Sequence, residues 1–185
     1  MIKYIVYKTK TDFTKRYAAL LSAKFKIPYL SMEEAKKKLI SGESILYMAG
    51  IRASKLYDIK KALAKYNVEA VVAVGMSAPS DEYNNEIKNS NNIKDIPLFY
   101  LRGGTAPDKL TGFDKFLFNA IAKMTEKSKQ KADKTADLSK KEEIQLTESF
   151  FKGIDYVAVE NLDSIIDWYS SYLIIQDMIS KKHKK

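Results

Sequence analysis

The sequence predicts an α/β fold, in which a doubly wound, five-stranded parallel sheet carries helices on both faces. Two observations support this prediction. Five short runs rich in β-branched and aromatic residues alternate with segments of helical period. One run, residues 68–74, is almost continuously apolar, as in a strand that is buried on both faces. Because parallel neighbours need crossover connections, this alternation favours a parallel sheet.

The expected strands are five short, mostly apolar runs. They are residues 2–7, 27–30, 44–49, 68–74 and 96–101, and a long polar loop precedes the last of them. Ligands in open α/β sheets bind at the carboxyl ends of the strands. We therefore expect a site in the loops at residues 8–14, 50–54, 75–83 and 102–108.

Three helices are expected between these strands. Apolar residues at helical spacing predict the first at 17–24. Ser31 is the predicted N-cap of a second helix, which extends to residue 40 and is ended by Gly42. A third, amphipathic helix is expected over 56–65, closed by Asn67.

Two later helices complete the expected domain, which covers residues 1–169. They are predicted from apolar faces at 113–124 and 162–173, with a basic polar connector at 123–141. Residues 170–185 are expected to form a helix extension and a Lys-rich tail. A second apolar stripe on the last helix comprises Trp168, Tyr172, Ile175 and Ile179. It has three open interpretations, namely a homodimer contact, a helix on a membrane surface, and ordinary packing.

The composition excludes several classes of chemistry. The absence of Cys rules out disulfides, thiolate nucleophiles and iron–sulfur clusters, and the one His leaves few metal sites or catalytic triads. The longest uncharged, mostly apolar run, residues 70–79, has half of the ~20 residues that a membrane-spanning helix needs. We therefore expect a cytoplasmic protein that depends on a cofactor for any redox work.

The formal net charge of +9 is concentrated in two segments. Residues 123–141 hold seven Lys against three acids, and four Lys follow residue 180, so these segments carry 8 of the 9 excess charges. The chain has three Arg, the residue on which readers of base edges rely. We therefore expect no specific nucleic-acid binding. Solvated segments or weak attraction to an anionic membrane surface account better for the two Lys runs.

The loop after the first expected strand carries the most informative motif. It reads Thr9, Lys10, Thr11, Asp12, Phe13, Thr14. Its hydroxyls and backbone N–H groups meet at the N-terminus of the next helix, where the helix dipole favours a phosphate. The motif predicts a mononucleotide site, and a simple N-cap and turn is the alternative.

The motif and its order along the chain resemble the flavodoxin family. Residues 5–7 followed by Thr9, Thr11 and Thr14 look like the family's strand and T-x-T-G-x-T loop. The resemblance continues through residues 49–51, 74–77 and 99–104 and covers about residues 1–169. The segment after the fifth expected strand is most similar to the flavodoxin-like branch that includes menaquinone-dependent protoporphyrinogen oxidase.

The resemblance implies non-covalent FMN as the cofactor. Its phosphate would be held by the loop at 9–14, and its ring would lie between the loops at 49–53 and 75–79. The flavin would carry the electrons, so the resemblance implies no catalytic acid or base. The cofactor-binding residues implied are Thr9, Lys10, Thr11, Asp12, Phe13, Thr14, Ala49, Gly50, Ile51, Arg52, Ala53, Gly75, Met76 and Ser77.

Asp12 departs from the family's pattern, which has Gly at this position. A carboxylate repels a phosphate, and a side chain disfavours the backbone shape that Gly adopts freely. Asp is nevertheless among the non-Gly residues that tolerate positive φ, and Lys10 and Arg16 are close enough in sequence to neutralise it. Two functions stay open: an FMN-binding electron-transfer protein or small flavin oxidoreductase, and a binding or scaffold module that has lost FMN.

The charge also bears on the partners. Flavodoxins are acidic because they dock on basic redox partners, so a basic chain favours an enzyme-like or membrane-peripheral role over a soluble carrier. Arg52 and Arg102 follow expected strands and are either surface residues or receivers of an anionic substrate. The expected partners are a redox partner protein or a quinone or tetrapyrrole substrate, at or near the inner face of the membrane.

Overall fold

The computed structural model describes residues 1–112, 115–116, 118–120, 122–123 and 152–182. The chain divides into two compact units, one formed by Met1–Gly103 with Val157–Lys185 and the other by Gly104–Tyr156. Every buried residue in the described part of the chain belongs to the first unit. The single domain expected over residues 1–169 stays a prediction.

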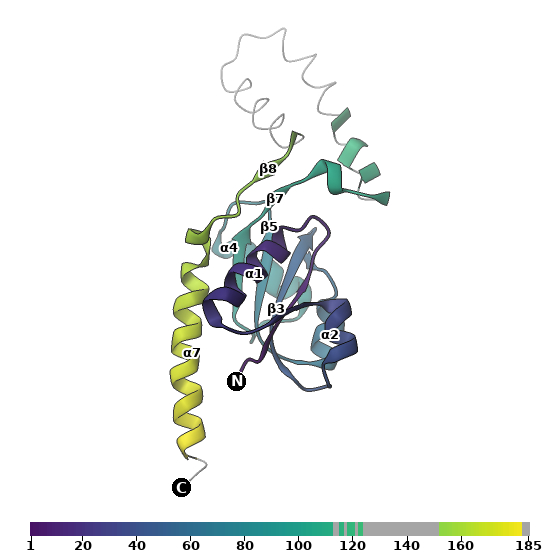
Figure 1. The fold of residues 1–185 in the computed structure, drawn as a ribbon. Coiled ribbons are helices and arrows are strands. Elements are labelled where there is room, and N and C mark those ends of the chain that lie inside the picture. The colour runs from purple at the N-terminus through teal and green to yellow at the C-terminus, as the bar shows by residue number, and fades with distance from the viewer. Residues whose placement is uncertain (113–114, 117, 121, 124–151, 183–185) are drawn as a thin grey trace. The chain divides into compact units, whose positions relative to one another are not determined.

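The first unit is built on a parallel sheet with the strand order β2-β1-β3-β5-β6 (Figure 1). The strands are β1 (Tyr4–Lys8), β2 (Tyr29–Ser31), β3 (Ser44–Arg52), β5 (Asn67–Gly75) and β6 (Leu98–Arg102). All neighbouring pairs along this order are parallel, which confirms the predicted fold class and all five strands. From β1 the chain goes to one side of the sheet, and from β3 to the other. The carboxyl ends of β1 and β3 therefore form the topological switch point where such sheets bind ligands.

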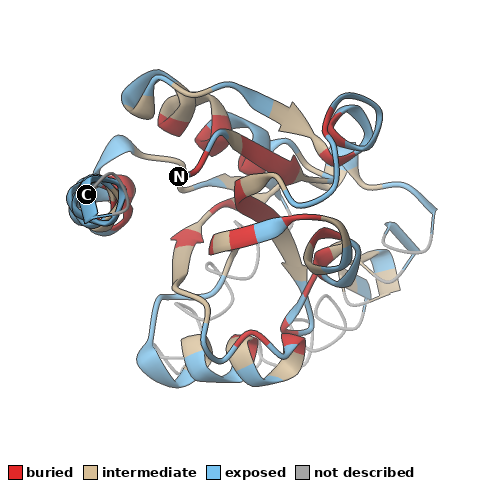
Figure 2. Ribbon diagram, turned by 90° about the horizontal axis from the view of Figure 1, so that it is seen from below, coloured by how far each residue is buried: buried red, intermediate tan, exposed pale blue. Residues whose placement is uncertain are grey.

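Helices cover both faces of this sheet. Helices α2 (Met32–Lys38), α3 (Ile59–Lys65) and α4 (Asp81–Asn91) share one apolar cluster with the sheet. Helix α1 (Phe13–Phe25) buries Tyr17, Ala18 and Leu21 outside that cluster. Helix α7 (Asp163–Lys182) stacks Tyr169 on Phe25 of α1, with ring centroids 3.8 Å apart. Figure 2, which looks along α7, shows buried residues on the side that faces the sheet.

Helix α4 corrects the prediction of a long polar loop before the last strand. Ser80 caps it by accepting a hydrogen bond from the Tyr83 N–H at 3.1 Å, and acids follow in its first turn. The helix ends at Asn92, which has φ 56. It buries two residues, Ile87 and Asn91, so its sequence shows no apolar period.

A β-hairpin corrects the loop predicted at residues 50–54. Strand β3 continues to Arg52 and pairs with the antiparallel strand β4 (Lys55–Leu56). The two turn residues, Ala53 and Ser54, have φ 46 and 57. Such turns usually carry Gly or Asn, so no residue here signals the turn.

Other element ends differ by a few residues from those predicted. Ser31 caps α2 in a capping box with Glu34, as expected. However, α2 ends at Lys38, well before Gly42, because Leu39 turns to extended backbone. Asn67 begins β5 instead of closing α3, which starts at Ile59 because the preceding residues form β4.

The second unit has little regular structure among its described residues. Strand β7 (Gly104–Thr105) pairs with the antiparallel strand β8 (Ile154–Asp155), and a 3-10 turn covers Pro107–Lys109. The described residues between 112 and 123 are helical, as predicted. The rest of that expected apolar face and nearly all of the connector at 123–141 lie outside the described residues.

Candidate functional site

The threonine-rich loop joins β1 to α1 at the switch point of the sheet. Lys8 is the last residue of β1, and Phe13 is the first of α1. Thr14 is buried, with 2% of its surface exposed, whereas Thr9 and Thr11 are half-buried and Lys10 and Asp12 are exposed. The threonine residues of the loop thus differ in burial, and they lie beside the N-terminus of α1.

Asp12 adopts the backbone shape for which glycine is the usual residue. Its φ is 69° and its ψ is −11°, which is the left-handed region. Its side chain makes no capping hydrogen bond to α1, whereas serine side chains cap α2 and α4. The Asp12 side chain therefore does not occupy the N–H groups at the start of α1, and N–H groups at helix N-termini are ones that can bind a phosphate.

The second predicted loop brings an aromatic side chain to the threonine loop. The Tyr57 N–H donates to the Gly50 carbonyl at 3.1 Å. A Cβ built on Gly50 would lie 3.1 Å from the Tyr57 ring and 3.8 Å from the Thr14 hydroxyl oxygen. The Lys10 ammonium lies 4.9 Å from the centre of the Tyr57 ring. Gly50 thus leaves Tyr57 close to the residues predicted to bind phosphate.

Sequence reasoning missed Tyr57, because it considered Ile51 and Arg52 as the residues beside the flavin. The chain reverses at Ala53 and Ser54, and this reversal returns Tyr57 to the level of Gly50. The hairpin leaves Ile51 half-buried and exposes Arg52 and Ala53. Only the register of the hairpin, which the sequence did not reveal, would have pointed to Tyr57.

The third predicted loop is held by Tyr100 of β6. The Tyr100 hydroxyl donates to the Ser77 carbonyl at 2.9 Å, and its ring meets that of Tyr83 edge-on at 5.3 Å. Burial raises the pKa of Tyr100 to about 12, so the hydroxyl stays a donor at neutral pH. A Cβ built on Gly75 would lie 2.7 Å from this hydroxyl oxygen, so a side chain there would displace Tyr100. Met76 is half-buried beside it, and Ser77 is exposed.

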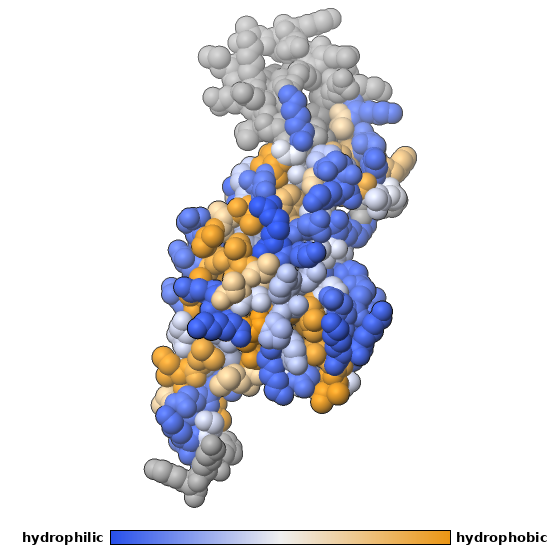
Figure 3. All heavy atoms as spheres, viewed as in Figure 1, coloured by the Kyte–Doolittle hydropathy of each residue, from blue (hydrophilic) through white to orange (hydrophobic). Residues whose placement is uncertain are grey.

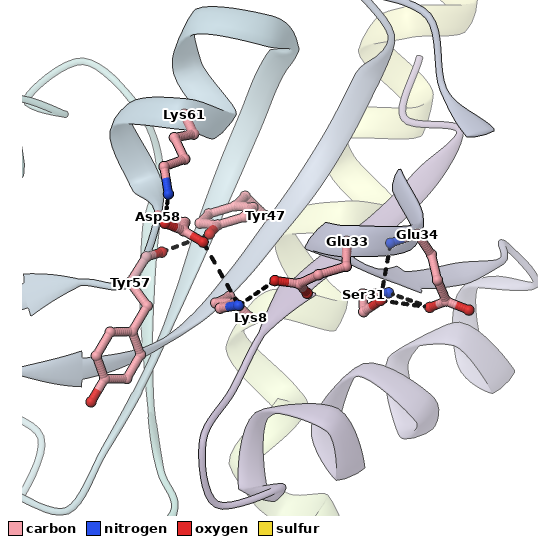
Figure 4. A network of polar contacts seen from close by, with 8 residues as sticks. All are labelled: Lys8, Ser31, Glu33, Glu34, Tyr47, Tyr57, Asp58 and Lys61. Carbon is pink, nitrogen blue, oxygen red and sulfur yellow. Dashed lines mark hydrogen bonds and ion pairs between the residues drawn. The ribbon is translucent and has the colours of Figure 1, made fainter. Parts of the chain in front are cut away.

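A polar network ties the end of β1 to α2 and α3 (Figure 4). The Lys8 ammonium pairs with Glu33 and lies 3.8 Å from the Asp58 carboxylate, which accepts a 2.7 Å hydrogen bond from Lys61. This bond from Lys61 holds the pKa of Asp58 below its ordinary value, and the bond from Lys8 does the same for the pKa of Glu33. The positive charge at the base of the loop is therefore already balanced by two carboxylates.

The same network supports Tyr57. The buried Tyr47 hydroxyl donates to the Tyr57 carbonyl at 2.6 Å. Burial raises the pKa of Tyr47, so this hydroxyl also stays protonated. Tyr57 is thus held at its N–H by Gly50 and at its carbonyl by Tyr47.

The strand register places the three loops along one edge of the sheet. Lys8 pairs with Ala49, Gly50 with Val74, and Gly75 with Arg102. The predicted site residues therefore lie at the carboxyl ends of neighbouring strands, at the same edge of the sheet. Arg52 and Arg102 belong to β3 and β6, which are separated by β5.

A cavity of about 340 Å³ lies beside the hairpin. Residues of β4, α3 and α4 line it, and no residue of the threonine loop contributes to it. The described residues contain no cluster of three His, Asp or Glu that could hold a metal ion. The groups that the structure brings together at the three loops are hydroxyls, backbone N–H groups and the Tyr57 ring.

Fold and site together define a doubly wound α/β domain with a hydroxyl-rich loop at its switch point. A family model described as a flavodoxin domain matches residues 4–132, which is more than half of the chain, and the chain therefore belongs to this family. The match confirms the flavodoxin-like resemblance, without distinguishing a branch of the family. No curated protein and no solved structure matches the chain.

Proposed function

We propose that this flavodoxin-domain protein binds FMN non-covalently at residues 9–14 and transfers electrons with it. The left-handed backbone of Asp12 is the observation that carries the proposal, because it gives an aspartate the shape of the family's glycine. The hydroxyls of Thr9 and Thr11 and the N–H groups at the start of α1 fit a phosphate. Membership of the flavodoxin-domain family supports the same cofactor.

The other loops would hold the ring of the cofactor. Tyr57, fixed at its N–H and carbonyl, offers an aromatic surface next to Gly50. The 75–77 loop, fixed by Tyr100, offers backbone groups at the end of β5, the neighbour of β3 in the sheet. When bound, FMN supplies electron transfer, while the residues of the chain bind and orient it and exclude water from one side.

We also propose an oxidoreductase role, in which a quinone or tetrapyrrole substrate or a redox partner protein exchanges electrons with the flavin. Arg52, which is exposed on the hairpin that carries Tyr57, supports an anionic partner at this site. An Arg52→Gln variant loaded with FMN should show a raised KM for an anionic quinone and an unchanged KM for a neutral one. Equal KM changes for both quinones would contradict this role for Arg52.

The competing function is a binding or scaffold module without flavin. The exposed carboxylate of Asp12 at the N-terminus of α1 favours it, because that charge opposes a phosphate there. A side chain at position 12 could also have prevented the backbone shape that the family's glycine adopts. This does not happen, since Asp12 has the left-handed conformation. The two functions therefore differ in whether the repulsion between the Asp12 carboxylate and a phosphate prevents FMN binding. A binding measurement determines which function holds.

The first experiment is a titration of the purified protein with FMN, followed by its visible absorption and flavin fluorescence. The wild-type protein should retain flavin after removal of the excess. A Thr9→Val/Thr11→Val variant should bind FMN more weakly by about 3–6 kcal/mol, at ~1.5–3 for each lost hydrogen bond to a charged group. Thr111→Val, an exposed site in the second unit, is the matched control.

Two outcomes would contradict the proposal. A folded wild-type protein that retains no flavin would favour the module. Unchanged affinity in the double threonine variant would mean that the 9–14 loop does not bind the phosphate.

A further inference from the structure

Helix α7 is packed on the sheet only over its N-terminal half. Ile165, Tyr169 and Tyr172 are its buried residues, and Trp168 lies against Phe99 of β6 with ring centroids 5.5 Å apart. From Leu173 to Lys182, no residue of the helix is buried. Ten residues of a regular helix therefore continue without the packing that holds the first half.

This second half exposes large apolar side chains on one side. Ile174, Ile175 and Met178, the C-terminal stripe, have 64%, 54% and 64% of their surface exposed. They are spaced i, i+1 and i+4, so they lie together on the helix surface. Figure 3 shows hydrophobic side chains gathered over the lower part of α7, with hydrophilic ones near its end. Solitary exposed apolar residues are ordinary, but a grouped set marks an interaction surface.

Positive charge is concentrated directly after the C-terminal stripe. Lys181 and Lys182 are exposed at the end of α7, and the sequence continues with two more Lys. One of these charges is balanced, since Lys181 pairs with Asp177 at 2.6 Å. An apolar stripe beside several lysines is the composition of a helix that lies on an anionic membrane surface.

We infer that the C-terminal stripe of α7 docks on the surface of an anionic lipid bilayer, with the adjacent lysines contacting lipid headgroups. The stripe lies outside residues 4–132, so the inference does not depend on the family match. No helix in the described part of the chain is long and apolar enough to cross a bilayer, so the contact is with the surface. Charge complementarity favours lipid over a second copy of the chain, because a second copy would bring an equally basic tail.

The test is co-sedimentation of the full chain with vesicles at about 0.1 M salt, where surface charges still interact over ~10 Å. Vesicles of phosphatidylcholine alone are compared with vesicles that also contain phosphatidylglycerol. The wild-type protein should bind the anionic vesicles and not the neutral ones. The anionic binding should fall steeply when the salt concentration is raised, because the lysines contribute electrostatically.

Two variants separate the apolar and basic contributions. Ile174→Ser/Ile175→Ser/Met178→Ser keeps every charge and should lower the partition coefficient at least tenfold. Lys181→Gln/Lys182→Gln keeps the stripe and should lower it by up to about 25-fold, at roughly fivefold for each lysine near the surface. Lys37→Gln/Lys38→Gln, which removes two exposed lysines from α2, is the matched control and should bind as the wild type does.

Circular dichroism of each variant verifies that α7 is still helical. Three results would overturn the inference: equal binding of the wild type to both kinds of vesicle, equal binding by the wild type and the stripe variant, or no binding at all. A wild-type dimer in solution that the stripe variant converts to a monomer would also overturn it, because the occupant would then be a second copy.

Discussion

Asp12 and Asp58 occupy equivalent positions before two helices. Both have left-handed backbones, with φ 69 and 52, and the side chain of neither makes a capping hydrogen bond to its helix. Asp58 forms a 2.7 Å ion pair with Lys61, whereas Asp12 stands at the loop proposed to hold a phosphate. The same left-handed backbone conformation therefore occurs at Asp58, which forms a structural ion pair, and at Asp12, which lies at a candidate anion site.

Removing the charge of Asp12 should strengthen FMN binding. Asn tolerates positive φ about as well as Asp, so Asp12→Asn removes the charge and keeps the backbone shape. We expect Asp12→Asn and Asp12→Gly each to bind FMN about tenfold more tightly, which corresponds to a repulsion of about 1.4 kcal/mol. Asp95→Asn, at an exposed residue before the amino end of β6, is the matched control and should leave the affinity unchanged. A gain in the glycine variant alone would mean that backbone shape limits binding, and no gain in either would contradict the repulsion.

The Asp58 carboxylate should stabilise the folded protein only while it is ionised. Its folded pKa is depressed by Lys61, so its stabilisation is present above the unfolded pKa of about 3.9 and is lost as the pH falls through the lower folded value. Asp58→Asn should lower the free energy of unfolding by about 1 kcal/mol at pH 7. Urea unfolding of both proteins at pH 7 and pH 3 checks this. A difference at pH 3 as large as at pH 7 would contradict the assignment.

The elements around the site are joined by one buried side chain, Asn91 of α4. Its Nδ2 donates to the Ser54 and Ile87 carbonyls, each at 2.7 Å, and its Oδ1 accepts from the Leu56 N–H at 3.0 Å. Asn91 thus fastens the β3–β4 hairpin, whose far end carries Tyr57, to the helix that follows the 75–80 loop.

Asn91→Ala should loosen this hairpin. The substitution leaves buried hairpin groups without a partner, so we expect a loss of about 2–4 kcal/mol in the free energy of unfolding. The flavin affinity should also fall severalfold, since Tyr57 would be held less firmly. Asn89→Ala, an exposed neighbour on the same helix, should change neither quantity. Full stability in the Asn91 variant would show that the hairpin does not depend on this residue.

The sequence predicted the elements whose pattern is local. An apolar run predicts a strand such as β5, and the capping residue Ser31 predicts the start of a helix. Helix α4 stayed hidden because it buries only two residues. The threonine loop was visible for the same local reason, whereas Tyr57 depends on a hairpin with a glycine-free turn and Tyr100 on the pairing of β6 with β5. Contacts set by strand register cannot be read from a single segment of sequence.

At the scale of the whole molecule, the first unit holds all of the buried core in the described part of the chain. The chain leaves it after Gly103 and returns at Val157. At this junction, Gly104 pairs with Asp155 and Thr105 with Ile154, so the ends of the intervening segment are adjacent strands of one antiparallel pair. The Ile154 N–H also donates to the Thr105 hydroxyl at 3.1 Å. A two-residue turn can close such a pair.

Replacing residues 106–153 with Asn-Gly should therefore give a folded protein. The dipeptide favours the type I′ turn that joins two paired strands, and the deletion removes no buried residue among those that the structure describes. We expect cooperative unfolding in urea and a far-ultraviolet dichroism spectrum with the helices of the first unit. FMN affinity within about threefold of the full chain is expected as well, a change of under 1 kcal/mol, because every proposed cofactor contact lies in residues 8–103. A version with Gly-Gly-Ser-Gly-Gly in place of the turn tests whether the tight turn itself matters. Aggregation or non-cooperative unfolding of both versions would show that the first unit needs the second to fold, while a folded protein with much weaker FMN binding would show that residues 106–153 contribute to the site.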